Sequence, residues 1–291
     1  MKLYKYQGAG NDFLIADNRD AHIRHEDGCL FYTEEGAERQ LRIADICDRR
    51  YGIGADGLML LDASDLYDFH MTYFNSDGSG GMMCGNGGRC MVAFAAYMGL
   101  THFDFDAADG FHSAEILSSE GNVKTIRLKM KDVMEYSRYE ALTGVDVPSE
   151  GWFLDTGTRH FVRFVNGIEE YDIVGEGRNI RYKAQELQPV GANVNYVEPC
   201  SEGIKVRTYE KGVEDETFAC GTGITASAIA SWLSGIESSE MMEDGRVRYG
   251  VYAKRDRLAV DFVPSKTSDE FHDVWLTGPA AYVAEIILQD I

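Results

Sequence analysis

The feature that most constrains this chain is a four-residue pattern that occurs twice, each time directly before a helix-forming run. Residues 84–87 read Cys-Gly-Asn-Gly, and residues 220–223 read Cys-Gly-Thr-Gly. The runs that follow, starting near Gly87 and Gly223, are apolar or small at nearly every position, which predicts helices buried on all sides. The two cysteines lie 220 − 84 = 136 residues apart, close to half of the 291 residues. Repetition at this spacing predicts two related halves.

A cysteine at the start of a helix is in an unusual electrostatic position. The first backbone N–H groups of a helix have no partner inside it and carry a partial positive charge, so they bind anions and favour a thiolate. Glycines beside the cysteine let a ligand approach the backbone. Two such thiols, Cys84 and Cys220, predict a base and an acid on opposite sides of one carbon, which is what inversion of a stereocentre requires. The alternatives are packed core thiols or a disulfide.

No cofactor is expected for this chemistry. An α-carbanion needs stabilisation, which some enzymes obtain from pyridoxal phosphate. The sequence has no phosphate-binding motif to anchor that group. Two helix N-termini aimed at the substrate carboxylate would serve instead. The six cysteines contain no C-x-x-C pair and no histidine cluster at zinc-site spacing, so no metal is expected.

Charge and hydropathy exclude several classes of partner. Lys and Arg total 28 against 48 Asp and Glu, a net charge of −20. This balance argues against nucleic acid and against anionic membranes. No apolar run reaches the length of a membrane span, and the N-terminus lacks the apolar core of a signal peptide. The expected partner is a small molecule, and the expected location is the cytoplasm.

Short apolar runs bounded by Gly, Asn or Asp predict a chain dominated by strands. Beside the two buried helices, a third helix is predicted from about Glu35 to Arg49, with Leu41, Ala44, Ile46 and Cys47 on its apolar face. Buried helices among many short strands predict a sheet curled around a central helix. Strands are predicted at 13–17, 58–62, 69–74, 125–130, 160–165, 193–197, 204–209, 247–253, 258–263 and 282–288.

These motifs together resemble the diaminopimelate epimerase family. The resemblance rests on residues 6–13, 52–57, 74–79, 84–90, 193–196, 208–212 and 216–223 and continues to 278–280. It implies an α/β (α+β) fold of two pseudo-symmetric domains, each a curled, mostly antiparallel sheet around a central helix, with the active site in the cleft between them. The implied domains are residues 1–130 plus 278–291, and residues 131–277. The resemblance also implies a homodimer.

The resemblance assigns a role to each matching residue. It implies that Cys84 and Cys220 are catalytic, and that His160 and Glu210 tune the pKa of the thiols. The remaining matches are implied to bind substrate: Asn11, Asn75, Gly85, Asn86, Asn193, Glu210, Lys211, Gly221 and Thr222. The family usually reads Gly-Asn-Pro-His where this chain has Gly157-Thr158-Arg159-His160. Thr158 therefore offers a hydroxyl where the family has an amide.

The implied activity is cofactor-independent epimerisation of LL-2,6-diaminopimelate to the meso form, an isomerase reaction of lysine and peptidoglycan precursor synthesis. One alternative is racemisation of another amino or imino acid, such as proline or hydroxyproline, by the same thiol pair. A second alternative, from another class, is a redox or binding protein in which Cys84 and Cys220 form a reversible disulfide. Because the net charge opposes steering of a dicarboxylate, binding is expected to rest on local groups, the helix ends, Lys211 and Arg159.

Overall fold

The chain folds into two compact units. A computed structural model describes residues 1–147, 149–264 and 270–288. Unit 1 contains residues 1–128 together with the C-terminal segment from Pro279, and unit 2 contains residues 129–278. The end of the first predicted domain, residues 289–291, lies outside the described residues. Each unit is described below by itself.

The strands of unit 1 close into a ring. Antiparallel pairing joins β1 to β2, β6 to β7, β8 to β9, β9 to β10 and β20 to β1, while β2–β6 and β7–β8 are parallel. A further pairing of β10 with β20 completes the circuit. The strands are β1 (Lys2–Gly8), β2 (Asn11–Asn18), β6 (Gly57–Asp62), β7 (Phe69–Asn75), β8 (Asp104–Ala107), β9 (Gly110–Glu120), β10 (Val123–Lys129) and β20 (Phe271–Ile287).

Unit 2 repeats this order of strands and directions. The pairings are, in order, antiparallel β12–β13, parallel β13–β14, antiparallel β14–β15, parallel β15–β18, antiparallel β18–β19 and antiparallel β19–β20. In unit 1 the same sequence of parallel and antiparallel pairings joins β1, β2, β6, β7, β8, β9 and β10. The strands are β12 (Gly151–Asp155), β13 (Arg159–Phe164), β14 (Asn193–Cys200), β15 (Gly203–Glu210), β18 (Val247–Tyr252) and β19 (Arg257–Pro264). The two halves predicted from the repeated cysteine pattern therefore share one topology.

Shorter strands flank these rings. In unit 2, β11 pairs with β12, β16 pairs with β15 and β17 pairs with β18. In unit 1, β3, β4 and β5 form a separate antiparallel sheet. Their bounds are β3 (Ile23–Glu26), β4 (Cys29–Glu34), β5 (Ala37–Arg42), β11 (Tyr136–Tyr139), β16 (Asp215–Thr217) and β17 (Glu240–Met241).

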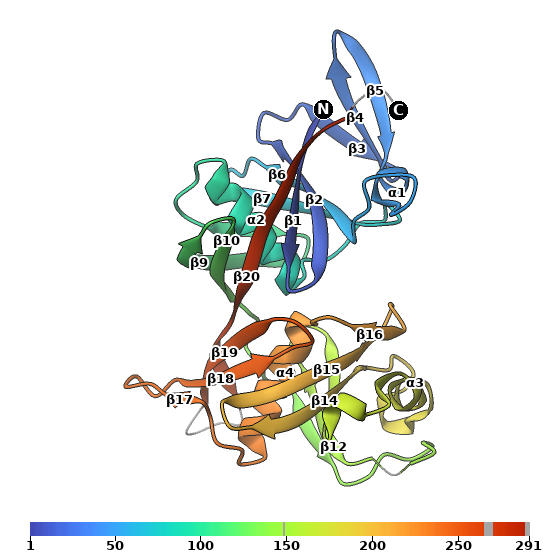
Figure 1. Cartoon of the computed structure of the whole chain (residues 1–291), viewed down its shortest axis with the longest axis vertical. Helices are drawn as coiled ribbons and strands as arrows, with labels where there is room; N and C mark the ends of the chain where they lie inside the picture. Colours follow the sequence, from blue (N-terminus) through green and yellow to red (C-terminus); the bar gives the residue numbers. More distant parts are fainter. Residues whose placement is uncertain (148, 265–269, 289–291) are drawn as a thin grey trace. The chain divides into compact units, whose positions relative to one another are not determined.

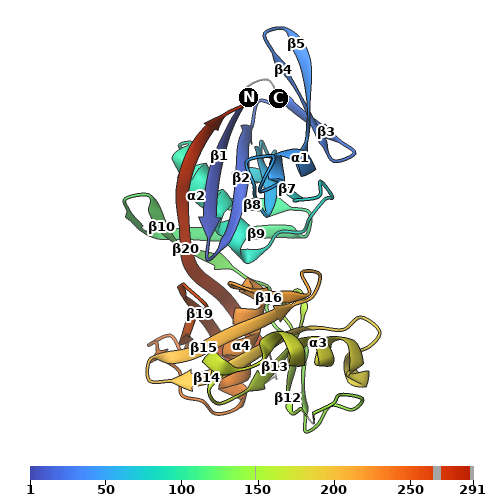
Figure 2. The ribbon, with the colours of Figure 1, turned by 45° about the vertical axis from the view of Figure 1, so that its right-hand side comes forward.

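Each ring surrounds one helix (Figures 1 and 2). Helix α2 (Gly85–Tyr97) is buried at every position from Gly85 to Ala95, and α4 (Gly221–Leu233) is buried along most of its length. Both helices begin two residues before the predicted starts. Because a sheet that curls around a helix covers all its sides, the sequence of each helix carries no polar stripe. The prediction of a mostly antiparallel sheet around a central helix is confirmed.

The helix predicted from Glu35 to Arg49 is wrong. Residues 37–42 form β5, and only α1 (Ile43–Cys47) is helical. Glu35 and Gly36 have φ angles of +52° and +80°, which form the tight turn between β4 and β5. That turn pairs the two strands before a helix can start. Leu41, which was assigned to the predicted helical face, is instead buried as part of β5.

One helix of unit 2 was missed by the sequence analysis. Helix α3 (Ile173–Lys183) begins at Asp172, whose carboxylate accepts a hydrogen bond from the Gly175 backbone N–H at 2.9 Å. Two internal glycines, Gly175 and Gly177, lowered its apparent helix propensity. Gly177 is required because a side chain there would lie 2.5 Å from the Cβ of Tyr209. Close packing on β15 thus overrides local propensity.

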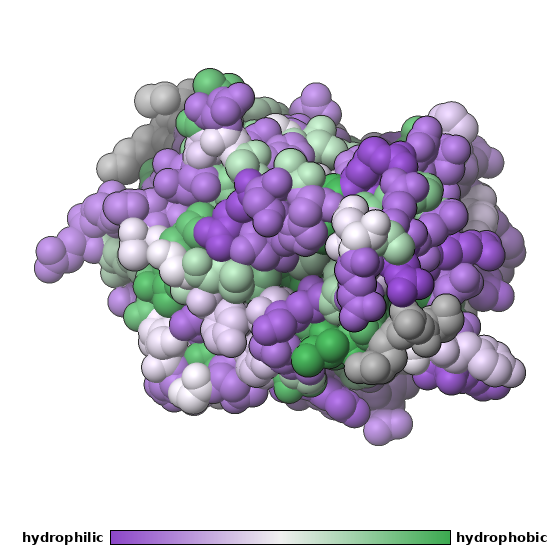
Figure 3. Space-filling view, turned by 90° about the horizontal axis from the view of Figure 1, so that it is seen from above, coloured by the Kyte–Doolittle hydropathy of each residue, from purple (hydrophilic) through white to green (hydrophobic). Residues whose placement is uncertain are grey.

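The surface carries mostly polar and charged side chains. Figure 3 shows a face dominated by hydrophilic residues, with small and scattered hydrophobic areas. Within the described residues, no helix is long and apolar enough to cross a membrane.

Candidate active site

Cys84 occupies the position immediately before α2. Its backbone is extended, with φ −109° and ψ 150°, and its carbonyl accepts the helix's first i→i−4 bond from Gly88 at 2.8 Å. The Sγ atom accepts a hydrogen bond from the Gly87 backbone N–H at 3.2 Å. The N–H groups of Gly85 and Asn86 precede the hydrogen-bond ladder of the helix, so they are oriented to bind an anion.

Cys220 occupies the equivalent position before α4. Its backbone is also extended, and its carbonyl accepts the bond from Ile224 N–H at 2.8 Å. Its Sγ lies 3.5 Å from Oγ1 of Thr222, and the residue is 9% exposed. Gly221, Thr222 and Gly223 supply the N–H groups that precede the helical ladder. The two cysteines therefore have the same backbone setting in topologically equivalent places, while the Cys84 thiol contacts Gly87 and the Cys220 thiol contacts Thr222.

The predicted substrate-binding residues of unit 1 gather at the end of the sheet where α2 begins. Asn11 is the first residue of β2, and Asn75 is the last residue of β7. Register places both at one edge, because Phe13 pairs with Gly57 in parallel and Gly57 pairs with Asn75 in antiparallel. The side chain of Asn75 donates to Oγ of Ser79 at 3.0 Å.

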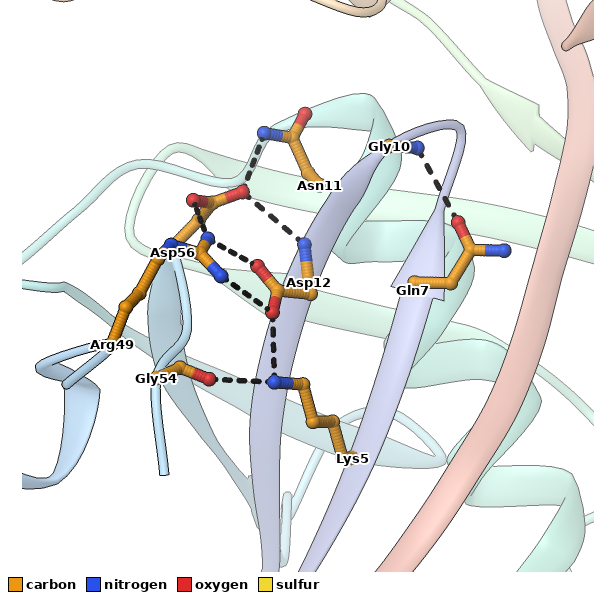
Figure 4. Close-up of polar contacts among 8 residues, drawn as sticks. All are labelled: Lys5, Gln7, Gly10, Asn11, Asp12, Arg49, Gly54 and Asp56. Atoms are coloured by element: carbon orange, nitrogen blue, oxygen red, sulfur yellow. Dashed lines mark hydrogen bonds and ion pairs between the residues drawn. The ribbon is translucent and has the colours of Figure 1, made fainter. Parts of the chain in front are cut away.

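A directed chain of hydrogen bonds connects the amides at this edge. Nη2 of Arg89 donates to Oδ1 of Asn86 at 2.7 Å, and Nδ2 of Asn86 donates to Oδ1 of Asn11 at 2.6 Å. Nδ2 of Asn11 then donates to Oδ2 of Asp56 at 2.9 Å (Figure 4). A guanidinium only donates and a carboxylate only accepts, so both ends fix the orientation of the two amides.

Charged side chains hold Asp56 in place (Figure 4). Nη2 of Arg49 lies 2.6 Å from carboxylate oxygens of both Asp12 and Asp56, and Nζ of Lys5 lies 2.9 Å from Asp12. Burial raises the pKa of Asp12, but the hydrogen bonds from Arg49 and Lys5 outweigh it, and the net shift is downward. Both carboxylates therefore face fixed positive charges, and the end of the amide chain is anchored.

In unit 2 the predicted residues occupy the matching strand ends. Asn193 starts β14 and Glu210 ends β15, as Gly57 and Asn75 do in unit 1. The amide of Asn193 ties two backbones together: Oδ1 accepts from Lys211 N–H at 2.8 Å, and Nδ2 donates to the Arg159 carbonyl at 3.1 Å. The side chain of Lys211 is exposed. Asn193 thus shapes the corner that presents Glu210 and Lys211.

His160 lies buried between these strand ends and the start of α4. Its Nε2 is 2.9 Å from Oγ1 of Thr158 and 3.0 Å from Oγ1 of Thr222, and these two hydroxyls are 3.0 Å apart. Burial lowers the pKa of His160 to about 3. His160 is therefore a neutral imidazole at physiological pH, and the Thr222 hydroxyl lies between its Nε2 atom and the sulfur of Cys220.

Several residues that hold the predicted site residues of each unit in place were not anticipated from the sequence. Arg89, Asp56 and Arg49 orient the amides of unit 1, and Asn195 and Thr208 contact the histidine group of unit 2. Arg89 was detectable as the one charge in an otherwise apolar helix sequence. Arg159, considered as a local binding group, instead lies against the Phe153 ring and donates to the Leu187 carbonyl.

Comparison with solved structures defines the fold class. A hydroxyproline epimerase from Agrobacterium vitis matches with a TM-score of 0.68 and 12% identity, over 98% of this chain and 90% of that chain. A PhzF-family phenazine biosynthesis protein from Bacillus anthracis matches with a TM-score of 0.67 and 14% identity, over 99% of both chains. The fold is thus the two-unit fold of the hydroxyproline epimerase and PhzF structures.

Sequence comparison is more specific. The family described as diaminopimelate epimerase matches residues 3–130. A diaminopimelate epimerase of Flavobacterium psychrophilum is 40% identical over 98% of this chain and 99% of its own length. One from Aquifex aeolicus is 38% identical over 98% of this chain and 96% of its own length. The chain belongs to the diaminopimelate epimerase family.

Proposed function

We propose that this chain interconverts LL- and meso-2,6-diaminopimelate without a cofactor, using Cys84 and Cys220 as the two proton carriers. The observation that carries the proposal is that each thiol precedes the central helix of its unit, at the same point of a repeated strand order. Full-length relatives of 37–40% identity bear the name diaminopimelate epimerase. We further propose that the enzyme is a cytoplasmic homodimer, which sedimentation analysis of the purified protein will test.

The proposed reaction is a proton exchange at one carbon. The thiolate of Cys220 removes the α-proton of the LL substrate, so the C–H bond breaks and an S–H bond forms. The thiol of Cys84 returns a proton to the opposite face, and its S–H bond breaks as the new C–H bond forms. In the reverse direction the two roles are exchanged. In each unit the thiol lies beside the N–H groups at the start of a helix, and these groups can stabilise charge on the carboxylate.

We assign the substrate's polar groups to the amides and charges beside the thiols. The amides of Asn11 and Asn86 lie side by side where α2 begins, and amide N–H groups suit a carboxylate oxygen. Lys211 is an exposed cation at the end of β15 and suits a second carboxylate. Glu210 suits the α-ammonium group. Asn75, Asn193, Thr158 and the N–H groups of Gly85, Gly221 and Thr222 complete the proposed set.

Substitution of the two cysteines tests this function. Cys84→Ala and Cys220→Ala should each abolish epimerisation, measured as loss of optical rotation of LL-diaminopimelate. The serine variants should still exchange one face of the α-carbon, seen as deuterium incorporation from D₂O. A matched control is Cys200→Ala, which alters a thiol at the opposite end of β14 from Asn193. Full turnover by Cys84→Ala would refute the mechanism.

Racemisation of proline or hydroxyproline is the second candidate function. It is favoured by Thr158 and Arg159, which stand where the family usually has asparagine and proline. A panel of amino acids assayed for loss of optical rotation decides between the two substrates. The redox alternative is decided by thiol titration before and after mild reduction, because a redox protein would change its thiol count without turning over any amino acid.

A further inference from the structure

The orientation of one buried amide sets the direction of the hydrogen bonds around His160. Nδ2 of Asn195 lies 3.0 Å from Nδ1 of His160 and 3.3 Å from the carbonyl oxygen of Phe161. Oδ1 of Asn195 lies 2.9 Å from the hydroxyl of Thr208. A carbonyl oxygen only accepts, so the atom facing Phe161 must be the amide nitrogen. Asn195 therefore donates to Nδ1 of His160 and accepts from Thr208.

This arrangement fixes the tautomer of His160. A neutral imidazole carries one N–H, and the nitrogen that accepts a hydrogen bond is the one without the proton. Because Nδ1 accepts from Asn195, the proton lies on Nε2. Burial lowers the pKa of His160, and no charged side chain among the described residues contributes to the shift. The ring therefore stays neutral with its donor aimed at Thr158 and Thr222.

The donor leads to the sulfur of Cys220 through a hydroxyl. Nε2–H is within 3.0 Å of the oxygens of both Thr158 and Thr222, and Oγ1 of Thr222 is 3.5 Å from Sγ of Cys220. A threonine oxygen that accepts from Nε2–H keeps its own proton to donate. The opposite tautomer would instead draw one of these hydroxyl protons onto Nε2, away from the sulfur.

We infer that Asn195 and Thr208 are positioning residues that make His160 a hydrogen-bond donor and so direct the Thr222 hydroxyl proton toward Cys220. A hydrogen bond donated to sulfur favours the thiolate, the form that acts as base. The expected effect on catalysis rests on the proposed function, whereas the position of the proton on the His160 ring does not depend on any substrate. Thr158 shares the histidine's donor.

The second glycine of the Cys-Gly-Thr-Gly pattern supports this reading. A Cβ atom at Gly223 would lie 2.3 Å from Oδ1 of Asn195 and 3.2 Å from Cε1 of His160. The helix backbone thus rests directly on the Asn195–His160 pair. Both residues are fully buried, so their orientation is fixed by packing as well as by hydrogen bonds. The glycine that identifies the motif in the sequence is the residue that admits this pair.

Nitrogen NMR of the ring tests the tautomer without substrate. Protein labelled with ¹⁵N-histidine, with the His160 signals assigned by their loss in His160→Gln, should show Nε2 protonated and Nδ1 unprotonated at neutral pH. The Thr208→Val variant keeps the shape of the side chain but removes the anchor of the amide, and it should populate both tautomers. A His160 ring protonated on Nδ1, or on both nitrogens, in the unsubstituted protein would overturn the inference.

Kinetics test the consequence for the thiol. Asn195→Leu and Thr208→Val should lower kcat by about 10- to 100-fold, the effect of losing a hydrogen bond to a charged group, with KM changed by less than about threefold. Ser231→Ala, which removes a buried hydroxyl nearly three turns along α4, is the matched control and should keep kcat. An unchanged kcat in folded Thr208→Val would contradict the role. If the unsubstituted protein turns over no diaminopimelate, the proposed function fails, and the NMR result alone decides the tautomer.

Discussion

Nη2 of Arg89 donates a hydrogen bond of 2.7 Å to Oδ1 of Asn86, and both side chains are buried. The same guanidinium donates from Nη1 to the Gly85 carbonyl at 3.1 Å and from Nε to the Pro279 carbonyl at 3.4 Å. One side chain inside α2 therefore holds the first turn of its own helix and the C-terminal strand. The orientation of the proposed carboxylate-binding amides depends on this buried cation.

Removal of this cation should impair both stability and substrate binding. In Arg89→Met, Asn86 loses its donor and can rotate, so kcat/KM for diaminopimelate should fall by about 10- to 100-fold, chiefly through KM. The free energy of unfolding should fall by about 1–3 kcal/mol, measured by urea denaturation. Arg24→Met, which removes an exposed arginine paired with Glu26, is the control. A folded Arg89→Met protein with unchanged KM would contradict the orienting role.

The second glycines of the two patterns should respond differently to alanine. At Gly223 the added Cβ meets Asn195 at 2.3 Å, whereas at Gly87 it meets Cys84 Sγ at 3.3 Å. Overpacking of this severity costs about 1–3 kcal/mol, although alanine is the better helix former by about 1 kcal/mol. Gly223→Ala should therefore lower the melting temperature and the activity more than Gly87→Ala does. Equal melting temperatures for the two variants would show that the side chains around Gly223 rearrange to accommodate the added methyl group.

The stability of the protein should fall as pH drops below about 6.5. Burial lowers the pKa of His160 from 6.5 to about 3, so the unfolded chain binds this proton more readily than the folded one. The stabilisation is complete above the unfolded-state pKa and is lost as pH falls toward the folded-state pKa. Between pH about 6.5 and about 5 this group should cost about 2 kcal/mol of unfolding free energy.

His160→Gln is the matched variant for this pH dependence, because a glutamine amide stays neutral throughout the range. Its urea denaturation curves should show a flatter dependence on pH than those of the unsubstituted protein between pH about 6.5 and about 5. Identical slopes in the two proteins would mean that His160 is already protonated in the fold.

Substrate binding should depend only weakly on salt. Diaminopimelate carries two carboxylates and two ammonium groups and is neutral overall, so the net charge of −20 does not steer it at long range, and affinity has to come from groups within hydrogen-bond distance, which salt screens little. KM should change by less than about threefold between about 0.05 and about 0.5 M NaCl. Lys211→Met should raise KM at every salt concentration. A steep salt dependence that disappears in Lys211→Met would show that long-range attraction dominates.

The sequence predicted the architecture well where the pattern was long or repeated. Two fully apolar helices after matching glycine-rich turns could fold only inside a sheet, so their burial in α2 and α4 followed from composition. The prediction from sequence failed at Glu35–Arg49, where two residues with positive φ form the turn of a hairpin. It also failed at α3, where a glycine allows the helix to pack closely on Tyr209. A local turn decided the first case, and packing against a residue distant in the chain decided the second.

For the site, the sequence by itself determined the chemistry: two cysteines before two helices, with glycines that expose the backbone and a histidine and asparagines at strand ends. Only the tertiary structure decided which way each amide points. Arg89, Asp56, Asn195 and Thr208 are ordinary polar residues in the sequence, and they acquire roles because strand register and helix packing bring their donors and acceptors within 3 Å. Hydrogen-bond direction depends on which partner can only donate or only accept, and that pairing exists only once the chain has folded.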